Sequence, residues 1–172
     1  RAHHLAEEWS LDAAILGSGT EFRRIAEIAE AGRPVITPVK YPDAPSVKDP
    51  YAADRVTLRD LQTWKYAPSN AKRLLDAGVM VTLTTTGAGP SGFHAGVRKA
   101  IEAGLPADEA LACMTVRPAR MLGIDHLAGT IEAGRLANLV VIEGELFDKE
   151  ATILEVWVAG RRDEVKSRTR FP

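Results

Sequence analysis

The sequence predicts an α/β protein built around parallel strands. Between residues 11 and 104, short apolar runs alternate with stretches whose apolar residues recur at helical spacing, a pattern typical of parallel strands joined by helices. After about residue 125 the pattern changes to short strands separated by glycine turns, which indicates antiparallel pairing. Three strand–helix units cannot close an eight-stranded barrel, so the first part forms either an open three-layer sheet or the last strands of a barrel.

Three buried strands are expected in the first part because three apolar runs are bounded by turn residues, at residues 13–16, 35–39 and 79–83. Helical spacing predicts a helix end over the first ten residues and further helices at residues 22–29, 58–65, 70–77 and 94–104. Ser69 or Asn70 is the expected N-cap of the 70–77 helix. Residues 40–55 contain three prolines and no apolar period, and loops of this length are usually functional.

A pair of helices is predicted at residues 105–123, with Thr115 as the cap of the second helix. Strands are then expected at residues 129–131, 136–142 and 153–158. Cys113 lies among apolar residues in the middle of a helix, so we expect a small buried hydrophobe and no nucleophile. The three tryptophans are expected in the core, namely Trp9, Trp64 and Trp157.

The composition excludes several classes of partner. The 172 residues are 45% apolar and carry a net charge of −1, which gives no electrostatic reason to expect nucleic acid or an anionic membrane. No apolar run approaches the roughly 20 residues that span a bilayer. A single cysteine excludes an internal disulfide and favours a reducing compartment such as the cytoplasm. Since the chain opens at Arg1 without a methionine, we expect an upstream portion.

Three motifs in the second half occur in a specific order. They are residues 115–123 (TVRPARMLG), residues 129–141 (GTIEAGRLANLVV) and residues 156–161 (VWVAGR). Together they resemble the C-terminal segment of the amidohydrolase superfamily, especially its imidazolonepropionase-like and Xaa-Pro-dipeptidase-like branches. Upstream segments around residues 15–21, 49–51, 56–61 and 83–87 are similar to the same family. The family often has Asp where Asn138 stands.

The resemblance implies a fold and two domains. Family members have a TIM-type (β/α)8 barrel beside a small β-sandwich built from both chain ends. Residues 1–124 would be a partial barrel carrying about strands six to eight, and residues 125–172 would supply strands to the sandwich.

The resemblance also implies a chemistry. Family enzymes use zinc or another divalent metal to lower the pKa of a bound water to about 7, and the resulting hydroxide attacks an amide-type carbon. Their ligands stand at the carboxyl ends of strands one, four, five, six and eight, where barrel active sites lie.

The sequence departs from that ligand pattern. Residues 17–19 (GSG) follow the expected strand six, where His is usual in the family, and Thr86 ends the expected strand eight, where Asp is usual. Thr63 occupies a further position where related sequences often have His. A hydroxyl is a poor zinc ligand beside imidazole or carboxylate. We therefore predict no metal ligand and no cofactor for this chain alone.

Six residues remain as candidates at the mouth of the barrel. Four of them are catalytic candidates and two are expected to contact a small-molecule substrate: Thr86, Lys40, Glu21 and His94 in the first group, Tyr41 and Ser18 in the second. Five of them have a plainer interpretation: Lys40 and His94 as surface residues, Tyr41 as loop packing, Glu21 as an acid in a first helical turn, and Ser18 as part of a tight turn.

Three functions are consistent with these observations. The chain is the C-terminal part of an amidohydrolase-like enzyme that hydrolyses C–N bonds in amides, cyclic amides or dipeptides, and is inactive by itself. Alternatively, it is a metal-less, degenerate barrel that binds a small molecule. A third hypothesis is an assembly module, because the open strand edges of a partial barrel favour self-association or pairing with the missing barrel half.

Overall fold

The computed structural model describes residues 2–46, 48–163 and 169–170. Its first part contains a parallel sheet with the strand order β1 (Ile15–Leu16), β2 (Val35–Pro38) and β3 (Val81–Thr84). In this register Val35 lies between Ile15 on one side and Val81 on the other. The predicted parallel pairing is therefore confirmed, and the carboxyl ends of all three strands meet at one edge.

Strand β1 is shorter and more exposed than expected. The apolar run at residues 13–16 predicted a buried strand, but only two residues pair and the Leu16 side chain is 60% exposed. The reason is its position, because β1 is an edge strand of the described sheet and packs against a neighbour on one side only.

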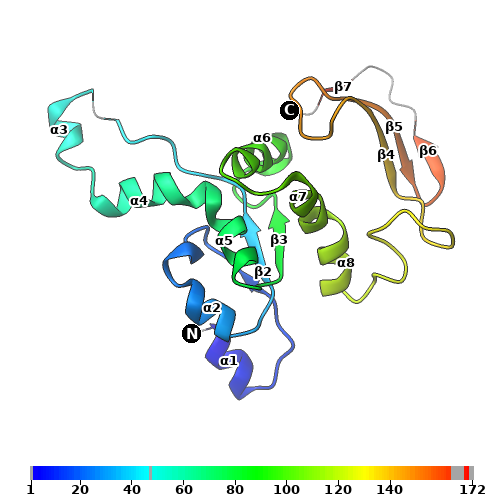
Figure 1. Cartoon of the computed structure of the whole chain (residues 1–172), viewed down its shortest axis with the longest axis horizontal. Coiled ribbons are helices and arrows are strands. Elements are labelled where there is room, and N and C mark those ends of the chain that lie inside the picture. The colour runs from blue at the N-terminus through cyan, green and yellow to red at the C-terminus, as the bar shows by residue number, and fades with distance from the viewer. Residues whose placement is uncertain (1, 47, 164–168, 171–172) are drawn as a thin grey trace.

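Helices surround the sheet, as Figure 1 shows. Before β3 they are α1 (Ala2–Glu8), the 3-10 helix η1 (Glu21–Arg23), α2 (Ile25–Glu30), α3 (Pro50–Ala53), α4 (Leu58–Tyr66), the 3-10 helix η2 (Ala67–Ser69) and α5 (Asn70–Asp76). After β3 they are α6 (Gly89–Glu102), α7 (Ala107–Met114) and α8 (Val116–Met121). Helices α5, α7 and α8 contact β3, and α6 contacts both α5 and α7. The segment with α3 and α4 extends away from the sheet (Figure 1). No helix among the described residues is long and apolar enough to cross a bilayer.

The core lies between β2, β3 and the helices. Its most buried members are at most 2% exposed and come from β2, α5, β3, α6 and the helical pair: Val35, Val39, Ala71, Leu74, Val81, Val97, Ala100, Leu105, Ala110 and Cys113. The expectation that Cys113 is a buried small side chain is confirmed.

Ser69 and Thr115 stand at the predicted N-cap positions of α5 and α8, but neither side chain forms a capping hydrogen bond. The Ser69 hydroxyl donates to the Tyr66 carbonyl oxygen at 2.9 Å, and the Thr115 hydroxyl donates to the Leu111 carbonyl oxygen at 2.8 Å. Both hydroxyls therefore bond back to the preceding helix, a common alternative to capping. Thr57, by contrast, forms a capping box with Asp60 at the start of α4.

Some boundaries also differ from the predictions. Helix α6 begins at Gly89, five residues before the predicted start, because Pro90 stands in its first turn, where its fixed φ and missing N–H suit a helix. The predicted 22–29 helix divides into η1 and α2, and the predicted loop at residues 40–55 contains the short helix α3.

The second part is an antiparallel sheet. Strand β5 (Thr152–Val158) pairs with β4 (Leu139–Glu143), β6 (Arg161–Asp163) and β7 (Thr169–Arg170). The strand predicted at residues 129–131 is wrong. Ile131 is 87% exposed and the surrounding residues form turns, in which the Arg135 N–H donates to the Glu132 carbonyl oxygen at 3.2 Å.

The prediction that the tryptophans lie in the core is wrong for two of the three. Trp9 and Trp64 are 67% and 43% exposed, and only Trp157 is half-buried, on β5. Helical spacing shows that two residues share a face, but it does not show what covers that face.

Gly96 of α6 lies against the backbone of Val39, the residue after β2. This close contact leads to a stability prediction. A Cβ at Gly96 would lie 2.2 Å from the Val39 carbonyl oxygen, which is a backbone atom and cannot rotate away. We expect Gly96→Ala to lower the free energy of unfolding by about 1–3 kcal/mol through overpacking, as measured by denaturant unfolding.

Gly92→Ala in the same helix is the matched control. Its Cβ would lie 3.6 Å from the Ala88 Cβ, an ordinary contact. We expect this variant to be as stable as the parent or more stable by about 0.5–1 kcal/mol, the usual helix preference for Ala. Equal stability of the two variants would contradict the close approach of α6 to β2.

Candidate functional site

The carboxyl ends of β1, β2 and β3 bring candidate residues from three segments to one edge of the sheet. A Cβ at Gly19, after β1, would lie 3.6 Å from the Pro38 Cγ atom at the end of β2. A Cβ at Gly87, after β3, would lie 3.3 Å from the Lys40 Cδ atom. Ser18, Lys40 and Thr86 therefore share this edge, as their positions after parallel strands predicted.

Glu21 organises the turn after β1. Its carboxylate accepts hydrogen bonds from the Ser18 backbone N–H, from the Ser18 hydroxyl at 3.0 Å and from the Gly19 N–H at 3.1 Å. A Cβ at Gly17 would lie 2.9 Å from the Glu21 Oε1 atom, so this turn closes tightly over the carboxylate. The turn places Ser18 and Glu21 together and uses much of Glu21's capacity to accept hydrogen bonds.

Asn70 holds the Glu21 carboxylate through a hydrogen bond. The sequence did not predict this role. The fully buried Asn70 side chain donates from Nδ2 to the Glu21 Oε2 atom at 2.7 Å and accepts at Oδ1 from the Phe22 N–H at 2.7 Å. The sequence marked Asn70 only as a helix cap, but no cap hydrogen bond forms at this end of α5. Because Glu21 and Phe22 are 49 and 48 residues from Asn70 in sequence, no local signal could have shown these contacts.

The end of β3 presents threonine hydroxyls. The Thr84 and Thr86 hydroxyl oxygens lie 3.0 Å apart, and the Thr86 N–H donates to the Thr84 hydroxyl oxygen at 3.2 Å. In the β2–β3 register Thr84 pairs with Pro38, one residue before Val39. Since successive side chains alternate between faces within a strand, Thr84 shares the face of Thr82 and Pro38, and Thr86 follows the end of the strand.

These donors do not fit zinc. Hydroxyl groups and a Lys40 ammonium stand at the strand ends, whereas zinc in proteins takes imidazole, thiolate or carboxylate. In residues 2–46, 48–163 and 169–170, no three His, Cys, Asp or Glu side chains gather in a way that could hold a metal ion.

Tyr41 and Lys40 diverge after β2. The Lys40 side chain is exposed and lies against Gly87, whereas Tyr41 is half-buried and packs against the core. Burial raises the pKa of the Tyr41 phenol well above its usual value. The phenol is therefore protonated at neutral pH and can donate a hydrogen bond.

His94 lies on α6, half-buried beside Phe93, whose ring meets the imidazole edge-on at a centroid distance of 5.9 Å. Burial, and secondly the charge of Arg98, lowers the pKa of His94. The imidazole is consequently neutral at pH 7, the form in which one ring nitrogen can accept a proton.

The Glu21–Asn70 contact can be tested by changing one atom. Asn70→Asp keeps the oxygen that accepts from Phe22, but it replaces the donor to Glu21 with a second acceptor inside the protein. We expect a loss of about 1–3 kcal/mol in the free energy of unfolding, measured by denaturant unfolding at neutral pH.

Asn138→Asp is the matched control, because the exposed Asn138 only accepts a hydrogen bond, from the Ala159 N–H at 2.8 Å. A carboxylate preserves that bond, so we expect a change within about 0.5 kcal/mol. Similar losses at the two positions would argue against a special role for the Asn70 donor.

The raised pKa of Tyr41 predicts a dependence of stability on alkaline pH. The unfolded phenol ionises near pH 10, while the folded phenol keeps its proton to higher pH, so the unfolded state releases protons first. Stability is therefore unaffected below about pH 10 and falls as the pH rises above that value. Tyr41→Phe should remove this loss when unfolding is measured between about pH 9 and 11; an unchanged alkaline profile would show that Tyr41 is not responsible.

Comparison with known proteins identifies the family of the chain and proteins of similar fold. A sequence profile described as the Amidohydrolase family matches residues 69–165. An amidohydrolase from Thermotoga maritima MSB8 superposes with a TM-score of 0.70 at 23% identity, covering 98% of this chain and 40% of that one. A Xaa-Pro dipeptidase with methionine bound in its active site superposes with a TM-score of 0.61 at 16% identity, covering 88% and 39%.

Among curated proteins, adenine deaminase 2 from Bradyrhizobium diazoefficiens is 38% identical over 65 residues, 37% of this chain and 10% of the relative. An adenine deaminase from Methanococcoides burtonii is 36% identical over 66 residues, 38% of this chain and 11% of the relative. The chain thus spans about 40% of the length of the solved structures and a tenth of the curated relatives. Because the family profile covers more than half of the sequence, and the parallel sheet followed by an antiparallel one agrees with it, the chain belongs to the amidohydrolase family.

Proposed function

We propose that this chain is the C-terminal portion of an enzyme that hydrolyses C–N bonds. One observation carries the proposal: almost the whole chain, 98%, superposes on the Thermotoga amidohydrolase and covers 40% of that protein. Residues 1–124 would supply barrel strands six to eight, as β1, β2 and β3, and residues 125–172 would supply strands to a sandwich. The upstream barrel strands would complete the enzyme.

In the complete enzyme the residues at the strand ends would bind and orient the substrate. Ser18 and Thr86 present hydroxyls, and Lys40 presents an ammonium group. Tyr41 directly follows Lys40, and His94 lies in the helix that follows Thr86. Glu21 and Asn70 would act indirectly, by fixing the turn that carries Ser18. A divalent metal supplies the hydrolytic water in enzymes of this kind, and its ligands would have to come from the upstream strands.

The bond hydrolysed is part of the proposal. The relatives by sequence are named adenine deaminases and two of the structural neighbours are named a Xaa-Pro dipeptidase and a prolidase. The first name refers to the C–N bond that joins an exocyclic amino group to a purine. The other two refer to the amide C–N bond to proline. Water can cleave both kinds of bond. Purine amines and proline dipeptides are therefore the two substrate classes to compare first.

A second candidate function rests on the same strand ends. Because hydroxyls and glycines stand where metal ligands would be expected on strands six and eight, the complete protein could be a barrel that binds a small molecule without metal. The exposed edge strand β1, with Leu16 60% exposed, further suggests pairing with the missing barrel half or with another copy of the chain.

The product of the native gene distinguishes these functions. For the enzyme, we expect an intact mass well above the 18.6 kDa of this chain, one or two tightly bound zinc ions by elemental analysis, and turnover of a purine amine or a proline dipeptide. Residues 1–172 expressed alone should bind no stoichiometric zinc and hydrolyse neither class.

Two lysine variants of the complete protein test whether these strand ends form the substrate site. Lys40→Met should lower kcat/KM about tenfold or more if the ammonium contacts the substrate. Lys48→Met, an exposed lysine in the same loop, should leave kcat/KM unchanged. A complete protein without zinc and without turnover would favour the binding function, and zinc-dependent turnover by residues 1–172 alone would contradict the proposal.

A further inference from the structure

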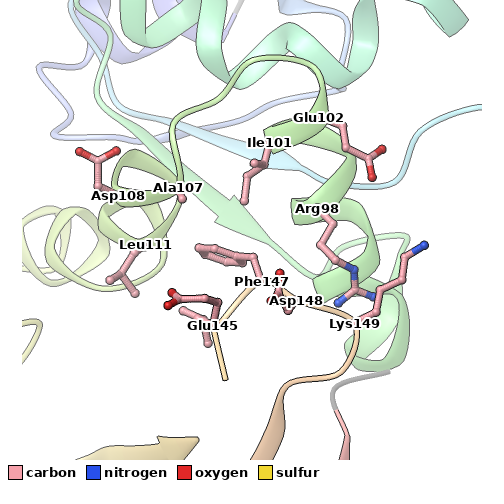
Figure 2. A pocket seen from close by; sticks show the side chains of 11 residues that line it. Arg98, Ile101, Glu102, Ala107, Asp108, Leu111, Glu145, Phe147, Asp148 and Lys149 are labelled. Carbon is pink, nitrogen blue, oxygen red and sulfur yellow. The ribbon is translucent and has the colours of Figure 1, made fainter. Parts of the chain in front are cut away.

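The structure contains a cavity that lies apart from the strand ends. This cavity of about 610 Å³ opens between α6, α7 and the loop of residues 144–151 that joins β4 to β5 (Figure 2). None of the strand-end candidates lines it. Its volume falls within the range of about 300–1,000 Å³ that small-molecule sites occupy.

The floor of this cavity is apolar and firmly held. Ile101 of α6, Leu111 of α7 and Phe147 of the loop face the same space in Figure 2, and Phe147 packs against the core. The loop is fixed by its own hydrogen bonds, since the Asp148 N–H donates to the Glu145 carbonyl oxygen at 2.9 Å and Ala151 is only 1% exposed. A ligand would therefore meet a preformed surface, which lowers the entropic cost of binding.

Acidic residues outnumber basic ones around the cavity, and Glu102 and Asp148 lie on the same side of Phe147 as the two basic residues (Figure 2). Two basic residues, Arg98 and Lys149, line it together with four acidic residues, so its net charge is −2: Glu102, Asp108, Glu145 and Asp148. In Figure 2 the Glu145 carboxylate lies beside Leu111, while Arg98 and Lys149 lie on the other side of Phe147.

Glu145 is an acidic residue of the cavity that lies beside the apolar side chain of Leu111 and away from Arg98 and Lys149 (Figure 2). Within the part of the chain that the structure describes, its side chain has no hydrogen-bond or ion-pair partner. A carboxylate next to an apolar surface is stabilised by an ammonium group that reaches it across that surface. The Phe147 ring adds a second attraction, because aromatic faces bind cations at about 0.5–1 kcal/mol on exposed sites.

From these features we propose that the cavity binds an organic cation of the alkylammonium class. Its apolar chain would lie over Ile101, Leu111 and Phe147, and its ammonium group would face Glu145. The ammonium group of Lys149, on the other side of Phe147, would disfavour the reverse orientation by repulsion. This site does not depend on the hydrolytic function, since it shares no residue with the strand ends.

The proposal can be tested with three probes of equal chain length. Hexylammonium, 1-hexanol and hexanoate would be titrated at low ionic strength into the complete gene product, labelled at isoleucine and leucine methyl groups for NMR. We expect hexylammonium to shift the Ile101 and Leu111 methyl resonances saturably, hexanol to bind several-fold more weakly, and hexanoate to bind most weakly. This readout needs no catalytic activity.

Two substitutions with opposite expected effects serve as matched variants. Glu145→Gln should weaken hexylammonium binding about two- to fivefold, the effect of one exposed ion pair, whereas Lys149→Gln should leave it unchanged or tighten it slightly. Both side chains are exposed, so neither change should impair folding, and unaltered methyl spectra away from the cavity would confirm this. Leu111→Ala should weaken all apolar probes roughly threefold or more.

Three results would overturn the proposal. The first is the absence of saturable methyl shifts with hexylammonium. The second is binding of hexanoate as tight as that of hexylammonium. The third is a greater loss of hexylammonium affinity from Lys149→Gln than from Glu145→Gln, which would indicate that the cavity prefers an anion.

Discussion

The close approach of α6 to the backbone of Val39, the residue after β2, is the contact on which the position of this helix depends. Strand β2 pairs with a neighbour on each side, and Gly96 lets the helix approach the Val39 backbone so closely that no Cβ fits between them. This approach fixes the height of α6 above the sheet, and α6 in turn contacts α5 and α7. Helix α6 also contributes Arg98, Ile101 and Glu102 to the lining of the charged cavity, so this contact bears on the position of one wall of the cavity.

The turn after β1 is held by hydrogen bonds from side chains of two distant segments of the chain. Glu21 receives hydrogen bonds from the backbone and side chain of Ser18, and the buried Asn70 holds Glu21 in place. A buried amide and a carboxylate that satisfy each other are favourable only when both partners are present. The arrangement therefore preserves the geometry of the strand end while the side chains exposed there are hydroxyls.

The two sheets differ in how much of their surface is buried by this chain. The core between β2, β3 and the helices is buried within the chain itself. The antiparallel sheet leaves Val140 and Val158 more than half exposed, and β1 is an exposed edge. In proteins of this family, whose solved members are about two and a half times longer than the part matched here, further chain would be available to cover such surfaces.

Alternating apolar runs determined the parallel sheet, the helical pair and the shift to antiparallel strands, because each pattern reflects which side of one element is buried. The sequence also placed Ser18, Lys40 and Thr86 at one edge, since residues after parallel strands share an edge whatever the loops do. It did not reveal the Asn70 contact or the cavity around Phe147, and it wrongly predicted a strand at residues 129–131 and buried positions for Trp9 and Trp64. Those features depend on segments that meet only after folding, because an exposed helical face and a buried one have the same spacing, and a hydrogen bond across 49 residues leaves no local pattern.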